Sequence, residues 1–371
     1  MGNKEVKVRH IISMLEKKAP SSFAFDWDNV GLQVGSKEQP VERVMVTLDV
    51  LENVVDEAIE NNIDLIVAHH PLLFVKLNKI DTSTPKGRAV QKLLQHNISV
   101  YASHTNLDIA EGGVNDVMSR LLDLNDTSPL IETSKDDLIK LAVFVPGTHV
   151  ESVRNAVSEA GAGHIGDYSH CTYQVKGEGT FKPLEGSTPY IGSEGRLEKV
   201  EEKRVETILP QSILPQVIEA MVNAHPYEEA AYDLYPLLNE GYVQGVGRIG
   251  NLREPIQLKD LCTLVKEKYK VPQLRFVGNP DQLVRRVAVL GGSGEKYYSD
   301  ALKQGADAYI TGDMSFHFAQ EAEESGLAVI DPGHHVEKVI LPEIKYWIES
   351  GHGKEIDVII SKSNTEPFNF A

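Results

Sequence analysis

The chain has 371 residues, of which 41% are hydrophobic and 25% charged, a composition typical of a soluble globular protein with room for two or three domains. Its 37 basic and 54 acidic side chains give a net charge of −17. This charge argues against nonspecific electrostatic binding to nucleic acid or to an anionic membrane.

The two cysteines, Cys171 and Cys262, lie in unrelated contexts. Neither a disulfide framework nor a thiolate metal site is therefore expected, and a reducing compartment is indicated. The first residues lack the apolar segment of a secretory signal, and no stretch approaches the roughly 18 apolar residues of a membrane span. The sequence predicts a cytoplasmic protein in which any metal ion would have nitrogen and oxygen ligands.

Strands alternate with helices in the first third of the chain. Residues 41–50 alternate as a strand does, and the apolar residues of 51–62 recur at helical spacing. Further strands are predicted over 63–68 and 98–103, with a helix between them and another near 114–122. This order predicts right-handed crossovers and a mainly parallel sheet.

The middle third has a different pattern. A strand–helix–strand order occurs twice, over 141–169 and 205–237, which predicts a small ferredoxin-like domain. The link over 177–195 is rich in Gly and Pro and indicates an ordered loop or hairpin. After about residue 250 the first pattern returns and ends in a helix over 334–350 that Pro342 is expected to kink.

We therefore predict an α/β fold in which a two-part α/β core is interrupted by an inserted α+β domain. The predicted divisions are 1–126 for the first half of the core, 127–250 for the insert and 251–371 for the second half. Imidazole and carboxylate groups follow five predicted core strands: Asp49; His69 and His70; His104 and Asp108; Asp313 and His317; His334, His335 and Glu337. All five groups are expected at the same sheet edge, because the working groups of open α/β sheets gather beyond the carboxyl ends of the strands.

The spacing of these groups indicates metal binding. His334 and Glu337 are one helical turn apart and could bind one ion together. Histidine with carboxylate and no cysteine suits Zn, Mn, Fe or Co. The adjacent His69 and His70 project in different directions, so each could bind one of two ions, with a carboxylate such as Asp108 as the bridge. Two ions about 3.5–4 Å apart would polarise an electrophile and generate a hydroxide at neutral pH.

Several of these residues have a second interpretation. His104, His317 and His335 could be structural or could orient a ligand, and His104 or His317 could instead transfer protons. Asp49 and Asp313 could equally cap the helices that follow them.

Three other stretches are open to two interpretations. Residues 291–294, GGSG, could cradle a phosphate, but a tight turn is favoured. Residues 224–236 could form a ligand or subunit surface, but a solvated turn is favoured. Trp27 is expected to anchor a loop whose turn is formed by Asp28 and Asn29.

Eight motifs resemble one family when they are taken in order: WDNVGLQVG at 27–35, AHHPLLF at 68–74, SHTNLD at 103–108, GEGTFKP at 177–183, AHPYEEAAYDLYP at 224–236, GGSG at 291–294, ITGD at 310–313 and DPGHHVEK at 331–338. The chain resembles the Nif-three-like dinuclear-metal proteins, named GTP cyclohydrolase 1 type 2 homologues. The resemblance covers essentially the whole chain, in the long bacterial form whose insert is similar to PII and CutA.

The resemblance implies a site and an assembly. It makes the following residues the ligands of two divalent ions, with His335 turned away: His69, His70, Asp108, His334 and Glu337. It also implies a toroidal homohexamer whose metal sites face an internal cavity, and opening of the purine ring of GTP or a related nucleotide.

Three hypotheses follow. The first is a metal-dependent hydrolase in which Asp108 is the catalytic bridging carboxylate and His104 could transfer protons. The second is a non-catalytic metal-binding hexamer whose insert senses a metabolite or binds a partner. The third is intracellular metal handling, which requires only reversible binding.

Overall fold

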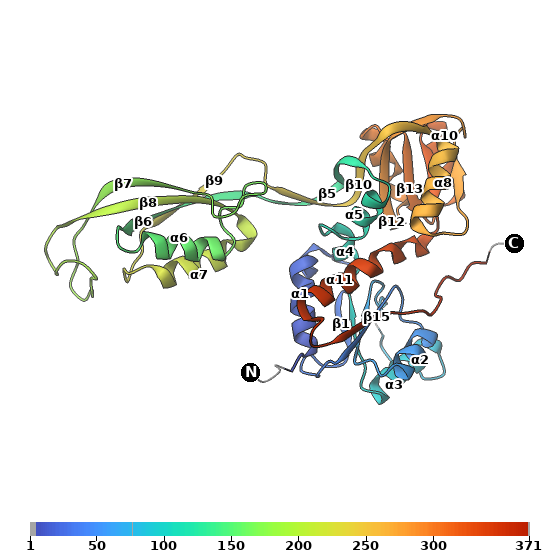
Figure 1. Cartoon of the computed structure of the whole chain (residues 1–371), viewed down its shortest axis with the longest axis horizontal. Helices are drawn as coiled ribbons and strands as arrows, with labels where there is room; N and C mark the ends of the chain where they lie inside the picture. The colour runs from blue at the N-terminus through green and yellow to red at the C-terminus, as the bar shows by residue number, and fades with distance from the viewer. Residues whose placement is uncertain (1–4, 76, 370–371) are drawn as a thin grey trace. The chain divides into compact units, whose positions relative to one another are not determined.

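The computed structural model describes residues 5–75 and 77–369 and divides them into two compact units (Figure 1). Unit 1 combines the chain up to Thr133 with the chain from Gln244, and unit 2 is Ser134–Val243. The divisions predicted at 127 and 250 fall inside two long strands, β5 (Asn125–Asp136) and β10 (Tyr242–Gln257), which lead into and out of unit 2.

The first sheet of unit 1 has five strands. In spatial order they are β1 (Gly31–Val34), β4 (Ser99–Ala102), β3 (Leu65–Ala68), β2 (Arg43–Thr47) and β15 (Asp357–Ile360). Neighbours from β4 to β15 run parallel, whereas β1 is antiparallel to β4. The three strands predicted for this region are confirmed, whereas β1 and β15 were not predicted.

The second sheet of unit 1 has six strands. In spatial order they are β11 (Arg275–Val277), β14 (Ala328–Asp331), β13 (Ala308–Gly312), β12 (Leu283–Ser293), β10 and β5. Strands β12, β13 and β14 are parallel, while β10 and β11 are antiparallel to their neighbours in this group. Because β5 and β10 lie side by side at one edge, the chain leaves unit 1 and returns to it at the same place.

Helices cover both sheets (Figure 1). Those of unit 1 are α1 (Val8–Lys18), α2 (Glu52–Glu60), α3 (Pro85–Gln95), α4 (Thr105–Ile109), α5 (Val114–Leu121), α8 (Leu258–Tyr269), α9 (Tyr298–Lys303), α10 (Phe316–Glu324) and α11 (Leu341–His352). Short 3-10 helices cover η1 (Ser21–Phe23), η3 (Glu295–Tyr297) and η4 (His334–Ile340). The expected Pro342 kink is wrong, because this proline lies in the first turn of α11, where its missing N–H leaves no bond unmade.

Alternation along the strands places the core on both faces of each sheet. In β2, Val44 and Val46 belong to one apolar cluster and Met45 to another that includes residues of α2 and α3. The first cluster also holds Val287 and Val289 of β12 and residues of α1, α5, α8 and α11. The two sheets therefore share one core. The expectation that all these polar groups lie at one sheet edge is wrong, because the strands that precede them belong to two different sheets.

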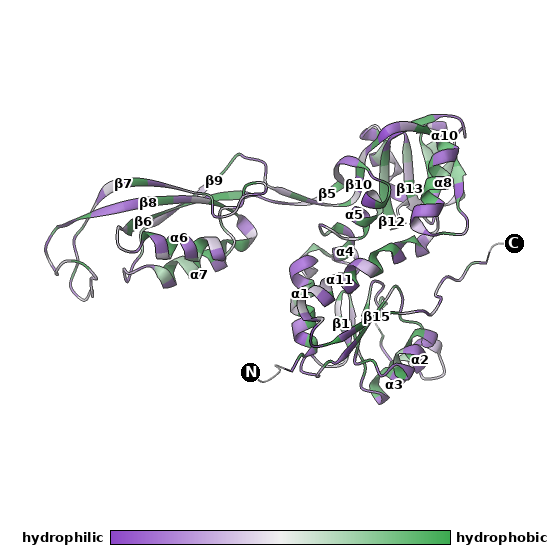
Figure 2. Ribbon diagram, in the orientation of Figure 1, coloured by the Kyte–Doolittle hydropathy of each residue, from purple (hydrophilic) through white to green (hydrophobic). Residues whose placement is uncertain are grey.

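Unit 2 has one sheet and two helices that carry both apolar and polar residues (Figure 2). Its elements are β6 (Leu138–Pro146), α6 (Val150–Glu159), β7 (Thr172–Phe181), β8 (Glu198–Pro210), η2 (Gln211–Ile213), α7 (Leu214–Ala224) and β9 (Tyr232–Pro236). The antiparallel sheet has the order β7-β8-β6-β9. The apolar face of β6, with Val143 and Val145, packs with apolar residues of α6 and α7.

Within the described ranges, no helix is both long enough and apolar enough to cross a bilayer.

A buried ion pair holds the point where β10 rejoins unit 1. Arg248 is 7% exposed and pairs with Asp116 of α5. Its guanidinium also donates to the carbonyls of Gly245 at 2.7 Å, Gly247 at 2.9 Å and Ile109 at 3.3 Å. This single side chain thus joins β10 to α4 and α5.

We expect Arg248→Met to lower the free energy of unfolding by about 3–5 kcal/mol, because it leaves a carboxylate and several carbonyls without their partner. Urea unfolding measures the loss. The control, Arg120→Met, removes a surface pair with Glu343 in which the arginine side chain is 62% exposed, and should lower it by less than about 1 kcal/mol. Equal losses in the two variants would contradict this account.

Candidate metal centre

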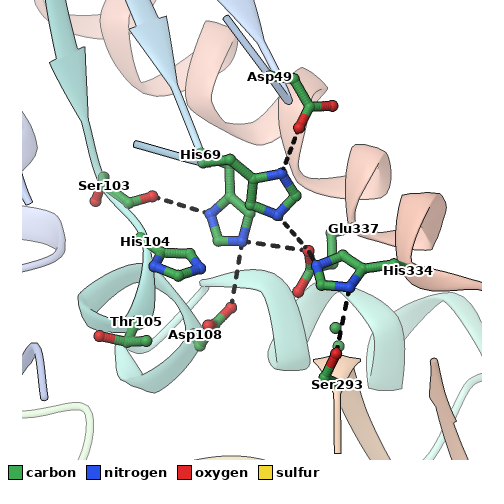
Figure 3. Close-up of polar contacts among 12 residues, drawn as sticks. Asp49, His69, Ser103, His104, Thr105, Asp108, Ser293, His334 and Glu337 are labelled. Atoms are coloured by element: carbon green, nitrogen blue, oxygen red, sulfur yellow. Dashed lines mark hydrogen bonds and ion pairs between the residues drawn. The ribbon is translucent and has the colours of Figure 1, made fainter. Parts of the chain in front are cut away.

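One ring nitrogen of His69 is held by the backbone at Ser103, and the other faces Asp108 and Glu337 (Figure 3). His69 follows β3 directly and is completely buried. Its Nδ1 donates to the carbonyl of Ser103 at 2.9 Å, since a carbonyl can only accept. That tautomer leaves Nε2 with an unshared lone pair, and Nε2 has no hydrogen-bond partner among the described residues. The arrangement is the one a metal-ligating imidazole requires.

Glu337 lies at the middle of the cluster. It is 2% exposed, and its Oε2 is 2.9 Å from Nε2 of His70, 3.3 Å from Nε2 of His334 and 3.6 Å from Nε2 of His69. His334 and Glu337 belong to the 3-10 helix η4 rather than to the expected α-helix. In a 3-10 helix residues three apart lie directly above one another, so the two side chains still share a face.

Asp108 approaches from α4. Its Oδ1 is 3.6 Å from His69 Nε2 without a hydrogen bond, and both atoms are buried and unpaired in the part of the chain that the structure describes. A buried polar atom left unpaired costs about 1–3 kcal/mol. Two donor atoms on one tetrahedral ion are expected about 3.4 Å apart. The separation of His69 Nε2 and Asp108 Oδ1 is close to this, so the pair fits a bound cation.

Three sets of three donor atoms lie within 4.8 Å of one another: His69, Asp108 and Glu337; His70, His334 and Glu337; and His69, His70 and His104. The first two sets have Glu337 in common. Asp108 was the bridge expected from the sequence, whereas the carboxylate common to these two sets is Glu337. Their nitrogen and oxygen donors fit divalent ions of the Zn, Mn, Fe or Co type.

Carboxylates orient two of the imidazoles from behind. Asp49 is 2.7 Å from Nδ1 of His70, and Asp313 is 2.7 Å from Nδ1 of His334. Neither caps a helix, because the N-cap residue is Leu51 for α2 and Ser315 for α10. Such carboxylate partners fix the tautomer and make the free nitrogen a better ligand.

His104 lies beside the cluster and is held by Asp28, a residue that was expected only to form a turn. Its ring centre is 5.3 Å from that of His69 and 5.6 Å from that of His70. Asp28 lies 2.9 Å from its Nδ1 and also accepts from the N–H of Thr105 at 3.0 Å. Burial opposes ionisation, yet these hydrogen bonds lower the pKa of Asp28 to about 2. No local pattern signals this pairing, because 76 residues separate its partners.

The other two candidate histidines lie apart from these sets. His335 points toward the C-terminal segment, with Nε2 3.3 Å from Thr365 Oγ1. His317 is exposed on α10 beside Phe316. The structure therefore brings together every expected ligand and His104, and it leaves out His317 and His335.

The backbone of the GGSG segment, residues 291–294, packs closely against the side chain of Glu337. Gly292 has φ +66°, and a Cβ there would lie 2.7 Å from Glu337 Oε1. The N–H of Gly291 donates to Asn115, whose side-chain amide donates in turn to the carbonyl of Asp108. These glycines let the backbone approach the carboxylate closely, which explains the motif without a phosphate.

The charges of the cluster balance only in part. Burial disfavours charge on His70 and His334, but Asp49 and Glu337 raise the pKa of His70 to about 10, and Glu337 and Asp313 raise that of His334 to about 9. Burial opposes ionisation of Glu337 as well, but the imidazoles hold its pKa well below the usual value. Burial and the Glu337 charge instead raise the pKa of Asp108 to about 8. The metal-free cluster therefore holds protons that a cation would displace.

A cavity of about 410 Å³ opens on these groups. Its lining includes His70, His104, Asp108, His334 and Glu337 on one side, and the aromatic side chains of Phe25, Trp27, Phe74 and Tyr297. Trp27 is 61% exposed and stacks on Phe25 at 5.7 Å between ring centres, with Phe74 edge-on at 6.0 Å. The expected loop anchor is thus an aromatic wall of the cavity.

Comparison with known proteins decides the family. The family model described as Duf34/NIF3 (NGG1p interacting factor 3) matches residues 6–367. The chain belongs to the Duf34/NIF3 family. The resemblance seen in the sequence motifs is thereby confirmed.

Individual relatives match this chain over almost their full length. A Bacillus subtilis protein named "GTP cyclohydrolase 1 type 2 homolog" is 47% identical over 370 residues, which are 99% of each chain. A crystal structure of a Bacillus cereus protein related to NIF3 is 45% identical with a TM-score of 0.93, and covers 100% of both chains. A crystal structure of a Staphylococcus aureus protein has 29% identity and a TM-score of 0.76, again over 100% of both chains.

The pKa of Asp108 predicts an unusual pH dependence for the chelated protein. Because its folded-state pKa of about 8 is higher than that of an unfolded chain, its protonated form stabilises the fold below the usual carboxyl range. This stability is lost as the pH rises to about 8. Asp108→Asn should remove that part of the decline, which urea unfolding in a chelator from pH 5 to 9 measures.

Glu337→Gln is the matched comparison. The carboxylate of Glu337 is ionised and faces three imidazoles. Replacing it with an amide should therefore lower the free energy of unfolding of the chelated protein at pH 7 by about 3–5 kcal/mol. The reverse ranking, with Asp108→Asn the more damaging change in the absence of metal, would contradict this charge assignment.

Proposed function

We propose that this chain holds two divalent metal ions and uses them to hydrolyse a nucleotide-like substrate. The observation that supports two ions best is the position of Glu337 Oε2, which faces the free nitrogens of His69, His70 and His334 at once. In the described part of the chain, His69 Nε2, which carries a lone pair and no proton, and Asp108 Oδ1 are buried beside this oxygen without a hydrogen-bond partner, which costs stability unless a cation binds there.

In this proposal the donors divide into two sets that share Glu337. His69, Asp108 and Glu337 would hold one ion, and His70, His334 and Glu337 the other. When bound, such a pair supplies Lewis acidity and lowers the pKa of a coordinated water. Asp49, Asp313 and the carbonyl of Ser103 keep the three imidazoles in the ligating tautomer.

The remaining groups of the cavity suit a planar substrate. Trp27 and Phe74 offer exposed ring faces and edges on which a heteroaromatic base can stack. Asp28 occupies Nδ1 of His104, so the proton that His104 gives or takes would be carried on Nε2. Among the described residues, those that line the cavity include aromatic rings but no lysine or arginine. GTP is the nominal substrate, from the names of the relatives.

The assembly and the insert are part of the same proposal. We infer a cytoplasmic toroidal homohexamer, consistent with two free cysteines and with the family. Residues 127–250 would be a ferredoxin-like domain of the PII/CutA type. The order of strands and helices in unit 2, β6-α6-β7-β8-α7-β9, and the sheet order β7-β8-β6-β9 support this.

A second candidate function is a non-catalytic metal-binding hexamer whose insert senses a metabolite. A cavity of about 400 Å³ in unit 2, separate from the metal cluster, favours it. The two candidates differ in whether the metal cluster turns over a substrate.

Adjacent histidines provide a test of the ligand assignment. Elemental analysis of the purified protein should find about two divalent ions per chain. His334→Ala should remove about one of them, whereas His335→Ala, which changes the neighbouring side chain that points away, should retain both. Full metal content in His334→Ala would contradict the assignment.

The hydrolase proposal is tested by GTP turnover in the metal-loaded protein. Asp108→Asn keeps the shape of the side chain and removes a ligand charge, so the rate of ring opening should fall about a hundredfold or more. The control, Asp116→Asn, changes a carboxylate of the Arg248 pair outside the cluster and should retain the rate if the protein remains folded. Turnover that survives Asp108→Asn would exclude this site as its source.

A further inference from the structure

A second cavity lies entirely in unit 2. Its volume is about 400 Å³, within the range of small-molecule sites. Strands β6, β7 and β8 contribute Phe144, Phe181 and Glu202, and the segments 182–191 and 227–231 supply further lining residues. The sequence motifs over 177–183 and 224–236 thus meet at one place.

The cavity is on the face of the sheet that the helices do not cover. Phe144 lies between Val143 and Val145, whose side chains pack in the core with α6 and α7. Successive side chains of a strand point to opposite faces, so Phe144 projects away from the helices. On that side the β7–β8 loop and the segment after α7 form the rest of the wall.

Three aromatic rings lie close to the ring of Tyr227. Its ring centre is 5.8 Å from that of Phe181, 6.3 Å from that of Tyr190 and 5.0 Å from that of His225. The face of a phenyl or phenol ring carries negative potential and attracts cations within about 6 Å. Several aromatic rings line this cavity, a composition that favours an organic cation.

A carboxylate is placed among these rings. Tyr227 donates its hydroxyl to Oε1 of Glu202 at 3.0 Å. The other oxygen, Oε2, lies over Gly179, where a Cβ would be only 2.2 Å away. Glycine at this position of β7 therefore leaves the space that the carboxylate occupies.

The charges of the lining agree with a cationic ligand. Glu202, Glu228 and Glu229 line the cavity against one lysine, Lys182. Glu228 also accepts from the backbone N–H of Thr188 at 2.9 Å, which ties the loop that carries Tyr190 to the segment after α7. An anion such as a nucleotide phosphate would meet a surplus of negative charge here.

We propose that this cavity binds a small organic cation with an ammonium group, held against the rings of Phe181, Tyr190 and Tyr227 and paired with Glu202. The proposal goes beyond the metal chemistry and does not depend on it. It gives unit 2 a ligand class that matches a sensing role.

Choline is a suitable probe, because 3,3-dimethyl-1-butanol has the same shape with carbon in place of the charged nitrogen. Isothermal titration of the full-length protein, in the presence of its metal ions, should show saturable choline binding. The neutral isostere should bind about tenfold more weakly or worse. Absence of choline binding, or equal binding of the two compounds, would overturn the proposal.

Matched variants locate the site. Glu202→Gln removes the charge, Tyr190→Ala removes an exposed ring, and Gly179→Ala displaces the carboxylate without changing the charge. Each should weaken choline binding about tenfold.

The controls change residues of unit 2 that do not line the cavity. Glu178→Gln and Tyr168→Ala, both at exposed positions, should leave choline affinity within about twofold. Choline affinity that is unchanged in all three cavity variants would overturn the proposal. A change in oligomeric mass without a change in choline affinity would instead indicate that a second copy of the chain covers the cavity.

Discussion

A buried carboxylate that faces free imidazole nitrogens is the constraint around which the site of unit 1 is built. Glu337 is 2% exposed, and an ionised carboxylate withdrawn from water loses several kcal/mol of hydration. Imidazoles compensate it on one side, but His69 Nε2 and Asp108 Oδ1 have no hydrogen-bond partner among the residues that the structure describes. A divalent cation would satisfy both at once, which is why charge rather than packing explains this cluster.

The fold brings the halves of the cluster together through one shared core. His69, His70 and Asp108 come from the first sheet and the segment after it, whereas His334 and Glu337 follow β14 of the second sheet. Apolar residues of both sheets and of the helices between them form a single cluster. The chain leaves for unit 2 and returns from it through neighbouring strands at one edge of the second sheet. The insertion therefore leaves the strands that carry the site in place.

The sequence predicted those parts of the site that follow from local pattern. Strand ends revealed His69, His70, Asp108 and Glu337, because a buried apolar run followed by polar groups is visible in one segment. The second sheet, the role of Asp28 and the shared position of Glu337 depend on contacts between distant segments, and no spacing rule encodes them. The 3-10 form of η4 was also missed, since a spacing of three residues is compatible with both helix types.

Anomalous X-ray diffraction from crystals of the metal-loaded protein would locate the ions themselves. We expect two peaks, one among His69, Asp108 and Glu337 and one among His70, His334 and Glu337, with the Glu337 carboxylate adjacent to both. A single peak that involves neither Asp108 nor His69, or no peak within this cluster, would contradict this expectation.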